Sequence, residues 1–154
     1  MYALTGQSGL AGEPLQPSCR KGHDKMLRIL VIEDSPVNMA LTVAILENAG
    51  HAILQADRAT EGLEIARREQ PDLVLMDIQL PDMDGLQATR TLKSDPRTAH
   101  LPVIALTAFA MKGDEDDTRA AGCHGYVTKP IRYKEFLAEM DAVMRRRGET
   151  PVPR

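Results

Sequence analysis

Five short apolar runs, separated by longer stretches with helical signals, are the feature that most constrains the fold of this chain. Three of the runs are rich in Leu, Ile and Val, and they occupy residues 26–32, 73–76 and 103–106. Weaker runs of the same kind occupy residues 51–56 and 125–128. A continuous apolar run of this length is typical of a strand that is buried on both faces of a parallel sheet.

The stretches between the runs carry the signals of helices. Ser35 followed by Pro36 indicates an N-cap with proline at the first helical position, and Gly50 indicates the end of that helix. Two later stretches repeat apolar residues at helical spacing. These residues are Ala59, Leu63 and Ala66, and then Phe136, Leu137, Met140, Val143 and Met144.

The alternation predicts an α/β fold in which five strand–helix pairs build a doubly wound, five-stranded parallel sheet with helices on both faces. We expect the flavodoxin-like (βα)5 arrangement with strand order 2-1-3-4-5. In such sheets ligands bind at the carboxyl ends of the strands, where the order of the strands switches direction. A functional site is therefore expected at that edge.

The two ends of the chain differ from its middle. Residues 1–25 are rich in Gly, Pro and Ser and have no periodicity, which predicts a disordered N-terminal tail. Residues 26–147 are expected to form one domain, and residues 148–154 a flexible C-terminal end without an output domain after it. Met26 directly precedes the first apolar run, so the sequence leaves open whether translation begins at Met1 or at Met26.

Composition excludes several classes of protein. A formal net charge of −3 shows no basic bias, which disfavours nucleic-acid binding. No apolar run approaches the roughly 18–20 residues that cross a bilayer, and the N-terminus lacks a secretory pattern. Two cysteines, Cys19 and Cys123, make no disulfide framework. We expect a cytoplasmic protein without membrane insertion.

Polar residues follow the apolar runs at the points where the strands should end. Glu33 and Asp34 follow the first run, Asp77 the third, Thr107 the fourth and Lys129 the fifth. In the order 2-1-3-4-5 the first and third strands are neighbours, so the three carboxylates should converge and repel one another. Mg²⁺ would remove that conflict, because it prefers oxygen ligands and binds carboxylates beside a phosphate. The sequence therefore predicts a pocket for a phosphoryl group and Mg²⁺.

Three stretches of the chain carry a resemblance to a known family. They read "ILVIEDSPVN", "PDLVLMDIQLPDMDGL" and "PVIALTAFAMKGDEDDTRAAGCHGYVTKPI". Together they resemble the response-regulator receiver domains, the CheY-like proteins, from residue 27 to about residue 145. The runs "MDIQLP" and "LTAFAMKGDE" are similar in particular to DivK-type single-domain regulators, which implies a role in cell-cycle or developmental control.

The resemblance implies a role for each residue of the pocket. Asp77 would accept a phosphoryl group from a phosphohistidine, with Mg²⁺ as the cofactor. Asp34 and Asp77 would ligate the metal directly, the Gln79 backbone carbonyl would add a ligand, and Glu33 would act through water. Lys129, whose bond to Pro130 would be cis, and Ala108 would contact the phosphoryl group.

The resemblance also implies a switch. Thr107 would bond to the phosphoryl group and Tyr126 would turn inward, which would change the surface made by the fourth helix, fifth strand and fifth helix. The partners would be a sensor histidine kinase or a histidine phosphotransfer protein, and a downstream protein that binds this surface. The chain would then be a phosphoacceptor signalling protein, which catalyses only its own phosphorylation and slow dephosphorylation, and not an enzyme acting on other substrates.

Other interpretations of the same residues stay open. Asp82 and Asp84, in "PDMDG", are best explained by turn formation and helix capping. The same letters also fit the nucleophile motif of haloacid-dehalogenase-type phosphatases, although that motif should directly follow its strand. An EF-hand loop, a flavin site, and a metal site from Cys19, His23, Cys123 and His124 are weaker alternatives. The serious rival is a binding module that docks on partners without being phosphorylated.

Overall fold

The structure is a computed structural model that describes residues 26–108 and 112–148, and the side chains of residues 26–108 and 116–146. The predicted tail over residues 1–25 lies outside the described residues, as does nearly all of the predicted C-terminal end. Within the described part, five strands alternate with five helices, so the predicted alternation is confirmed.

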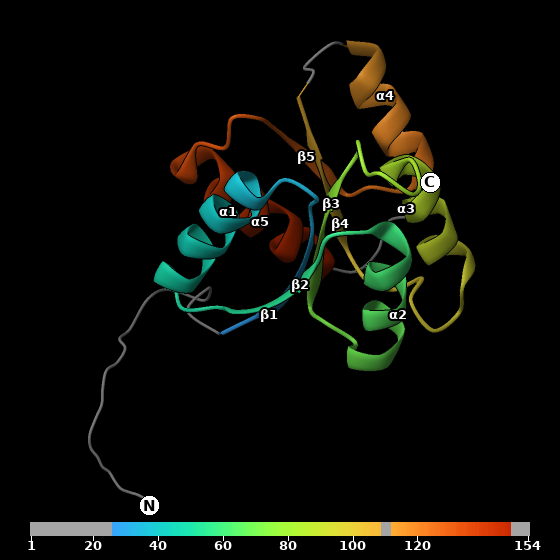
Figure 1. Cartoon of the computed structure of the whole chain (residues 1–154), viewed down its shortest axis with the longest axis horizontal. Helices are drawn as coiled ribbons and strands as arrows, with labels where there is room; N and C mark the ends of the chain where they lie inside the picture. Colours follow the sequence, from blue (N-terminus) through green and yellow to red (C-terminus); the bar gives the residue numbers. More distant parts are fainter. Residues whose placement is uncertain (1–25, 109–111, 149–154) are drawn as a thin grey trace, which may run out of the picture.

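The strands form one parallel sheet in the order β2-β1-β3-β4-β5, which confirms the predicted order. β1 and β3 lie next to each other, while β2 and β5 form the two edges (Figure 1). The strands are β1 (Arg28–Ile32), β2 (Ala52–Ala56), β3 (Leu73–Asp77), β4 (Val103–Thr107) and β5 (Gly125–Thr128). β3 and β4 each extend one residue beyond the apolar run, so Asp77 and Thr107 are the last residues of their strands.

The helices cover both faces of the sheet, with α1 and α5 on one side and α2, α3 and α4 on the other (Figure 1). They are α1 (Pro36–Asn48), α2 (Ala59–Glu69), α3 (Gly85–Ser94), α4 (Lys112–Ala121) and α5 (Tyr133–Gly148). Each face of the sheet has its own apolar cluster, and successive residues of β1 pack into opposite clusters. Leu30 and Ile32 pack with α2 and α3, whereas Ile29 and Val31 pack with α1 and α5.

Aspartates of one loop cap two different helices. Asp84 is the N-cap of α3, and its side chain accepts a hydrogen bond from the Leu86 N–H at 2.8 Å. Asp82 instead accepts from the N–H groups of Ala59 and Thr60, at 2.9 and 3.0 Å, and so caps α2. The N-cap residue of α2, Arg58, makes no such side-chain bond. Capping by both aspartates is confirmed, but the helix that Asp82 caps begins more than 20 residues earlier.

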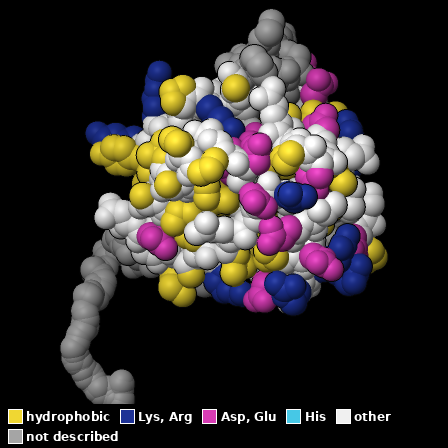
Figure 2. All heavy atoms as spheres, viewed as in Figure 1, with side chains coloured by type: hydrophobic (Ala, Val, Ile, Leu, Met, Phe, Trp, Pro, Cys, Tyr) yellow, Lys and Arg dark blue, Asp and Glu magenta, His cyan; other side chains and the backbone are white. Residues whose placement is uncertain are grey.

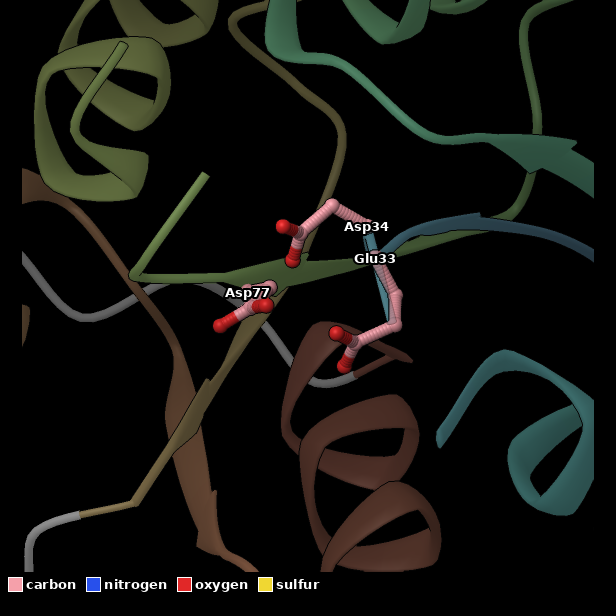
Figure 3. A group of neighbouring side chains, drawn as sticks. All are labelled: Glu33, Asp34 and Asp77. Atoms are coloured by element: carbon pink, nitrogen blue, oxygen red, sulfur yellow. The ribbon is translucent and has the colours of Figure 1, made fainter. Parts of the chain in front are cut away.

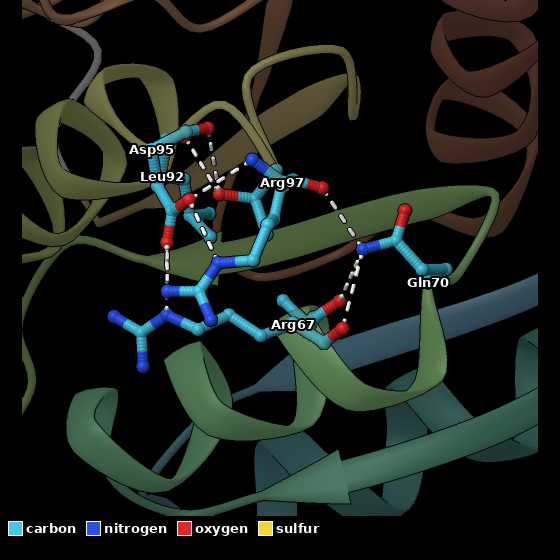
Figure 4. A network of polar contacts seen from close by, with 7 residues as sticks. Arg67, Gln70, Leu92, Asp95 and Arg97 are labelled. Atoms are coloured by element: carbon cyan, nitrogen blue, oxygen red, sulfur yellow. Dashed lines mark hydrogen bonds and ion pairs between the residues drawn. The ribbon is translucent and has the colours of Figure 1, made fainter.

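A polar network lies near the amino ends of the strands, where α2 ends and the chain leaves α3 for β4 (Figure 4). The Asp95 carboxylate accepts hydrogen bonds from Arg97 Nε at 3.1 Å, from the Arg97 backbone N–H at 2.9 Å, and from Arg67 Nε at 3.1 Å. Gln70 Nε2 donates to the Arg97 carbonyl at 2.9 Å. The two arginines, Arg97 above all, hold the pKa of Asp95 well below its usual range.

No helix among the described residues combines the length and the apolar character needed to span a bilayer.

Candidate functional site

The site is built where β1 and β3 end side by side. Ile32 pairs with Met76 in the parallel register, so Glu33 and Asp77 follow as the next residues on the two strands. The Glu33 N–H donates to the Ala56 carbonyl at 3.0 Å, which fixes the chain just beyond β1. The topology therefore brings together two acidic residues that lie more than 40 positions apart in the sequence.

Three carboxylates converge at this edge, as the sequence predicted (Figure 3). Glu33, Asp34 and Asp77 each offer an oxygen atom, and these atoms all lie within 4.8 Å of one another. Glu33 and Asp77 are only 1% and 2% exposed, whereas Asp34 faces solvent. Two of the three charges are thus removed from water, where an uncompensated carboxylate is costly.

Lys129 supplies a positive charge to the buried pair. Its Nζ lies 3.0 Å from Glu33 Oε1 and 3.2 Å from Asp77 Oδ2. The Lys129 backbone N–H donates to the Thr107 carbonyl at 2.7 Å, which anchors the lysine to the end of β4. The Lys129–Pro130 peptide bond is cis, as the resemblance implied. The ammonium therefore bridges carboxylates from the ends of β1 and β3.

The environment of the site disfavours the charged form of Asp77 but favours the charged form of Lys129. Burial, together with the neighbouring Glu33 carboxyl, raises the pKa of Asp77 to about 6, although the Gln79 N–H and Lys129 act in the opposite direction. Burial lowers the pKa of Lys129, but its contacts with Glu33 and Asp77 outweigh burial and raise that pKa overall. Lys129 therefore stays charged, while Asp77 is easier to protonate than an ordinary aspartate.

The donor set fits a hard divalent cation. When all the groups are ionised, three carboxylates and one ammonium leave two negative charges at the site. Glu33 Oε1 is buried, and no described residue gives it a hydrogen bond of good geometry, although Lys129 forms an ion pair with it. All donors are oxygen atoms, which Mg²⁺ prefers. Glu33, Asp34 and Asp77 are thus the described residues that could hold such an ion.

The remaining predicted residues surround Asp77. The Gln79 N–H donates to Asp77 Oδ1 at 3.0 Å and fixes the orientation of that carboxylate. Thr107 is 3% exposed at the end of β4, and Ala108 follows it at the surface. Tyr126, on β5, pairs with Ala105 on β4 and is half-buried against the apolar cluster beneath α2 and α3.

Gly85 was not singled out from the sequence, yet it shapes the site. A Cβ atom at this position would collide with the Asp77 carbonyl oxygen and with the Ile78 backbone. The Gly85 N–H donates to the Ile78 carbonyl at 2.7 Å, so α3 begins directly against the end of β3. Its position after Asp84 was the available signal, because glycine permits such a close approach of two backbones.

The alternative metal site from cysteine and histidine receives no support. Cys19 and His23 lie outside the described residues. Cys123 is buried 3.8 Å from Thr89 Oγ1, and burial raises the pKa of its thiol to about 11. His124 is exposed and accepts the Val103 N–H at Nδ1. Cys123 therefore contributes to packing, and His124 holds the start of β4.

Comparison with known proteins assigns the geometry to a family. Residues 29–141 match the sequence pattern of the response regulator receiver domain. The chain is 45% identical over 109 residues to the polar-differentiation response regulator DivK of Brucella anthropi, a match that covers 71% of this chain and 89% of that protein. The DivK of Brucella ovis matches with the same identity and coverage.

Solved structures agree with this assignment. The receiver domain of a sensor histidine kinase from Pseudomonas aeruginosa, which holds magnesium in its active site cleft, is 32% identical. The match has a TM-score of 0.71 and covers 81% of this chain and all of that domain. The chemotaxis protein CheY4 of Vibrio cholerae, at 22% identity, has the same fold, with a TM-score of 0.73 over 77% of this chain and 99% of that protein.

Proposed function

Because this chain belongs to the response regulator receiver domain family, we propose that Asp77 accepts a phosphoryl group from a phosphohistidine. The donor is a sensor histidine kinase or a histidine phosphotransfer protein of a two-component phosphorelay. The observation that carries the proposal is the buried Asp77 carboxylate, held 3.2 Å from the Lys129 ammonium at the carboxyl edge of the sheet. The chain acts as a phosphoacceptor and does not turn over a separate substrate.

The transfer begins with an oriented carboxylate. The Gln79 N–H holds one Asp77 oxygen, and a pKa of about 6 leaves the group mostly ionised at neutral pH. An oxygen of Asp77 attacks phosphorus, a P–O bond forms, and the P–N bond breaks with its electron pair going to the donor imidazole. The product is an acyl phosphate, which water later hydrolyses to phosphate and the free carboxylate.

Charge neutralisation carries much of the rate in phosphoryl transfer. Lys129 already contacts Asp77, and its ammonium group pairs with an oxygen of the phosphoryl group when that group arrives. Ala108 borders that group at the surface. Asp34, Asp77 and the Gln79 carbonyl would hold Mg²⁺ directly and Glu33 would act through water, and the bound ion would supply Lewis-acid stabilisation of the phosphoryl oxygens.

The signal leaves the site through the end of β4. A phosphoryl group adds about −1.5 to −2 charges and strong acceptor oxygens, and the Thr107 hydroxyl donates to one of them. The movement of Thr107 opens space for Tyr126, which turns inward from its half-buried position. The surface of α4, β5 and α5 then takes the form that a downstream protein binds.

The relatives and the free thiol support a setting for the reaction. Similarity to DivK, a regulator of polar differentiation, supports a role in cell-cycle or developmental control. We place the reaction in the cytoplasm, where the free Cys123 thiol agrees with a reducing environment.

Intact-mass measurement after incubation with acetyl phosphate and Mg²⁺ tests the proposal. We expect one phosphoryl adduct, which is lost with a chelator and in Asp77→Asn. Asp84→Asn is the matched control, because this aspartate of the same loop only caps α3, and it should still be labelled. A folded wild-type protein that gains no adduct, beside a known receiver that does, would leave docking without phosphorylation as the function.

A further inference from the structure

Two histidines occupy equivalent places at the two edges of the sheet. His51 directly precedes β2 and His124 directly precedes β5, and these are the two edge strands. Each histidine lies three residues after the end of a helix, α1 for the first and α4 for the second. In both connections a glycine with positive φ turns the chain, Gly50 at 96° and Gly122 at 108°. Similar turns thus place an imidazole at the amino end of each edge strand.

Each imidazole accepts a backbone hydrogen bond from the neighbouring inner strand. The Leu27 N–H, just before β1, donates to His51 Nδ1 at 3.1 Å, and the Val103 N–H, the first of β4, donates to His124 Nδ1 at 3.3 Å. The carbonyls of the same two donors accept from the N–H groups of Ala52 and His124, at 2.9 and 2.7 Å. Each imidazole therefore adds one bond to the end of a strand pair.

The added bond requires a neutral imidazole. A neutral ring carries its hydrogen on one nitrogen, and because Nδ1 accepts, that hydrogen is on Nε2. A proton taken up from solvent at Nδ1 turns the acceptor into a donor, which then faces the backbone N–H. Two donors cannot share a hydrogen bond, so the ring must turn away and the bond is lost.

Charged side chains of both signs lie on the elements that meet at His51. Glu47 lies four positions before it at the end of α1, and it favours the imidazolium together with the carbonyl end of that helix. Arg28 on β1 disfavours the imidazolium, but its guanidinium pairs with Glu69 at 2.9 Å and its N–H donates to Asp72. Figure 2 shows acidic and basic side chains interspersed over α2, the helix that ends with this ion pair.

The surroundings of His124 are also mixed. Arg146 on α5 donates to the His124 carbonyl at 2.9 Å, Lys93 on α3 lies against the turn before it, and Arg119 lies in the last turn of α4. These cations disfavour the imidazolium. Glu139 on α5, which lies over the first residue of β5, and the carbonyl end of α4 favour it. Charges of both signs therefore meet at each ring, and its protonation follows the pH of the medium.

We propose that His51 and His124 form a pair of acid-sensitive clips, which hold the amino ends of β2 and β5 to the sheet at neutral pH and release them when the imidazoles take up protons. The pairing of β1, β3 and β4 rests on main-chain bonds and stays closed. Because β5 belongs to the α4–β5–α5 surface, its clip makes the shape of that surface depend on pH. The clips act at the amino ends of the strands and do not require a phosphorylated Asp77.

Nuclear magnetic resonance of the isotope-labelled full-length chain tests the proposal. At about pH 7.5 we expect Nδ1 of both rings to be an unprotonated acceptor. Hydrogen exchange, corrected for the intrinsic effect of pH, should show the protection of the Leu27 N–H falling about tenfold by about pH 5.5. The Val103 N–H should lose about threefold, because His124 is exposed to solvent. The Val74 N–H donates to the Pro102 carbonyl at the same end of the sheet and should keep its protection.

Matched variants isolate the two imidazoles. His51→Asn and His124→Asn keep an oxygen that can accept the same N–H and does not titrate, so each should remove the pH dependence of its own clip. His51→Ala should lose the protection of the Leu27 N–H at every pH. His100→Asn, which changes an exposed histidine, should leave both profiles unchanged. Asp77→Asn removes a carboxyl whose pKa of about 6 lies in the same range, and both profiles should persist in it.

Four results would overturn the proposal. A hydrogen on Nδ1 of either ring at about pH 7.5 would exclude the bond. A pH dependence that persists in the two asparagine variants, or that disappears in Asp77→Asn, would assign the effect to other groups. A parallel loss of protection at the Val74 N–H would indicate general unfolding in acid instead of released edge strands.

Discussion

Asp77 lies at the carboxyl ends of the strands and Asp95 lies near their amino ends. The two aspartates differ in burial, in the charges beside them and in pKa. Asp77 is 2% exposed beside two other carboxylates, and its pKa is raised to about 6. Asp95 accepts hydrogen bonds from Arg67 and Arg97, and its pKa lies well below the ordinary value. The residue type is the same, so the surrounding charges and the burial make the difference.

The contrast separates the carboxylate that we propose as the phosphoacceptor from one that holds the fold. At the carboxyl edge, three acids share one lysine, which leaves negative charge for a cation and an electrophile to neutralise. At the amino ends of the strands, one acid meets two arginines, so no negative charge remains to be neutralised. A strained group of this kind lowers stability in exchange for reactivity, whereas a satisfied one contributes stability alone.

The largest expected effect comes from removing the shared cation. Lys129→Met leaves Glu33 and Asp77 buried without compensation, and we expect a loss of about 3 kcal/mol in the free energy of unfolding at pH 7 without Mg²⁺. Urea unfolding measures this loss. Adding Glu33→Gln to the variant should recover part of it, because one buried charge is removed. An unchanged urea midpoint in Lys129→Met would mean that the carboxylates do not depend on the lysine.

The next effect concerns the pH dependence of the strained aspartate. A raised folded pKa means that the stability contributed by protonated Asp77 is full below about pH 4 and is lost as the pH rises through about 6. Relative to the wild type, Asp77→Asn should therefore gain about 2 kcal/mol between pH 4 and pH 7 in the presence of a chelator. Urea unfolding across this range, repeated with Mg²⁺, tests the sign. A gain that persists with saturating Mg²⁺ would contradict an electrostatic origin.

Asp82 extends the comparison of Asp77 with Asp95, because it lies near Asp77 but has a structural role like that of Asp95. The hydrogen bond from the Thr60 N–H lowers the pKa of Asp82, burial opposes it, and the Ala59 N–H adds to the lowering, so that the pKa is lowered overall. We expect Asp82→Ala to cost about 1 kcal/mol, as the loss of an N-cap does. Hydrogen exchange should accelerate at Ala59 and Thr60 but not at Leu86, which Asp84 caps. Uniform acceleration across both helices would indicate general destabilisation instead.

Asp95→Asn should have the smallest effect, since its partner Arg97 is largely exposed and solvent screens the salt bridge between them. A lowered folded pKa contributes stability above the unfolded value and loses it as the pH falls. The urea midpoint of the wild type should therefore exceed that of the variant at neutral pH, and the difference should shrink below the ordinary pKa of 3.8. A difference that grows in acid would reverse the assignment.

The fold was predictable because its central strands β1, β3 and β4 are buried on both faces. Continuous apolar runs such as residues 73–76 are unambiguous when helical signals separate them, and the strand order then brings Glu33, Asp34 and Asp77 together. The contact between Lys129 and Glu33 was not predicted, because the reach of a long side chain depends on tertiary packing. The assignment of Asp82 to α2 was missed for the same reason, since its partners lie in a different segment.

The apolar outer face of α1 shows where periodicity fails as a guide. Helical spacing identified α2 and α5 by an apolar stripe, but α1 is apolar on the side packed against the sheet and also on much of the side that faces solvent. Its boundaries came from Ser35, Pro36 and Gly50, and the hydrogen bond that the Asn38 N–H donates to the Ser35 hydroxyl oxygen confirms the start of the helix. Capping signals locate a helix even where hydrophobic patterning does not reveal which side faces solvent.

The cap that Asp82 places on α2 has a consequence for transplanting loops between receivers. A loop cut after β3 and replaced by one from another protein would also remove the acceptor for the Ala59 and Thr60 N–H groups. The recipient would then carry a well-formed β3 beside an α2 that is frayed at its start. Chimeras of this chain should exchange the loop and the start of α2 together, although the rest of α2 and all of β3 lie between them in the sequence.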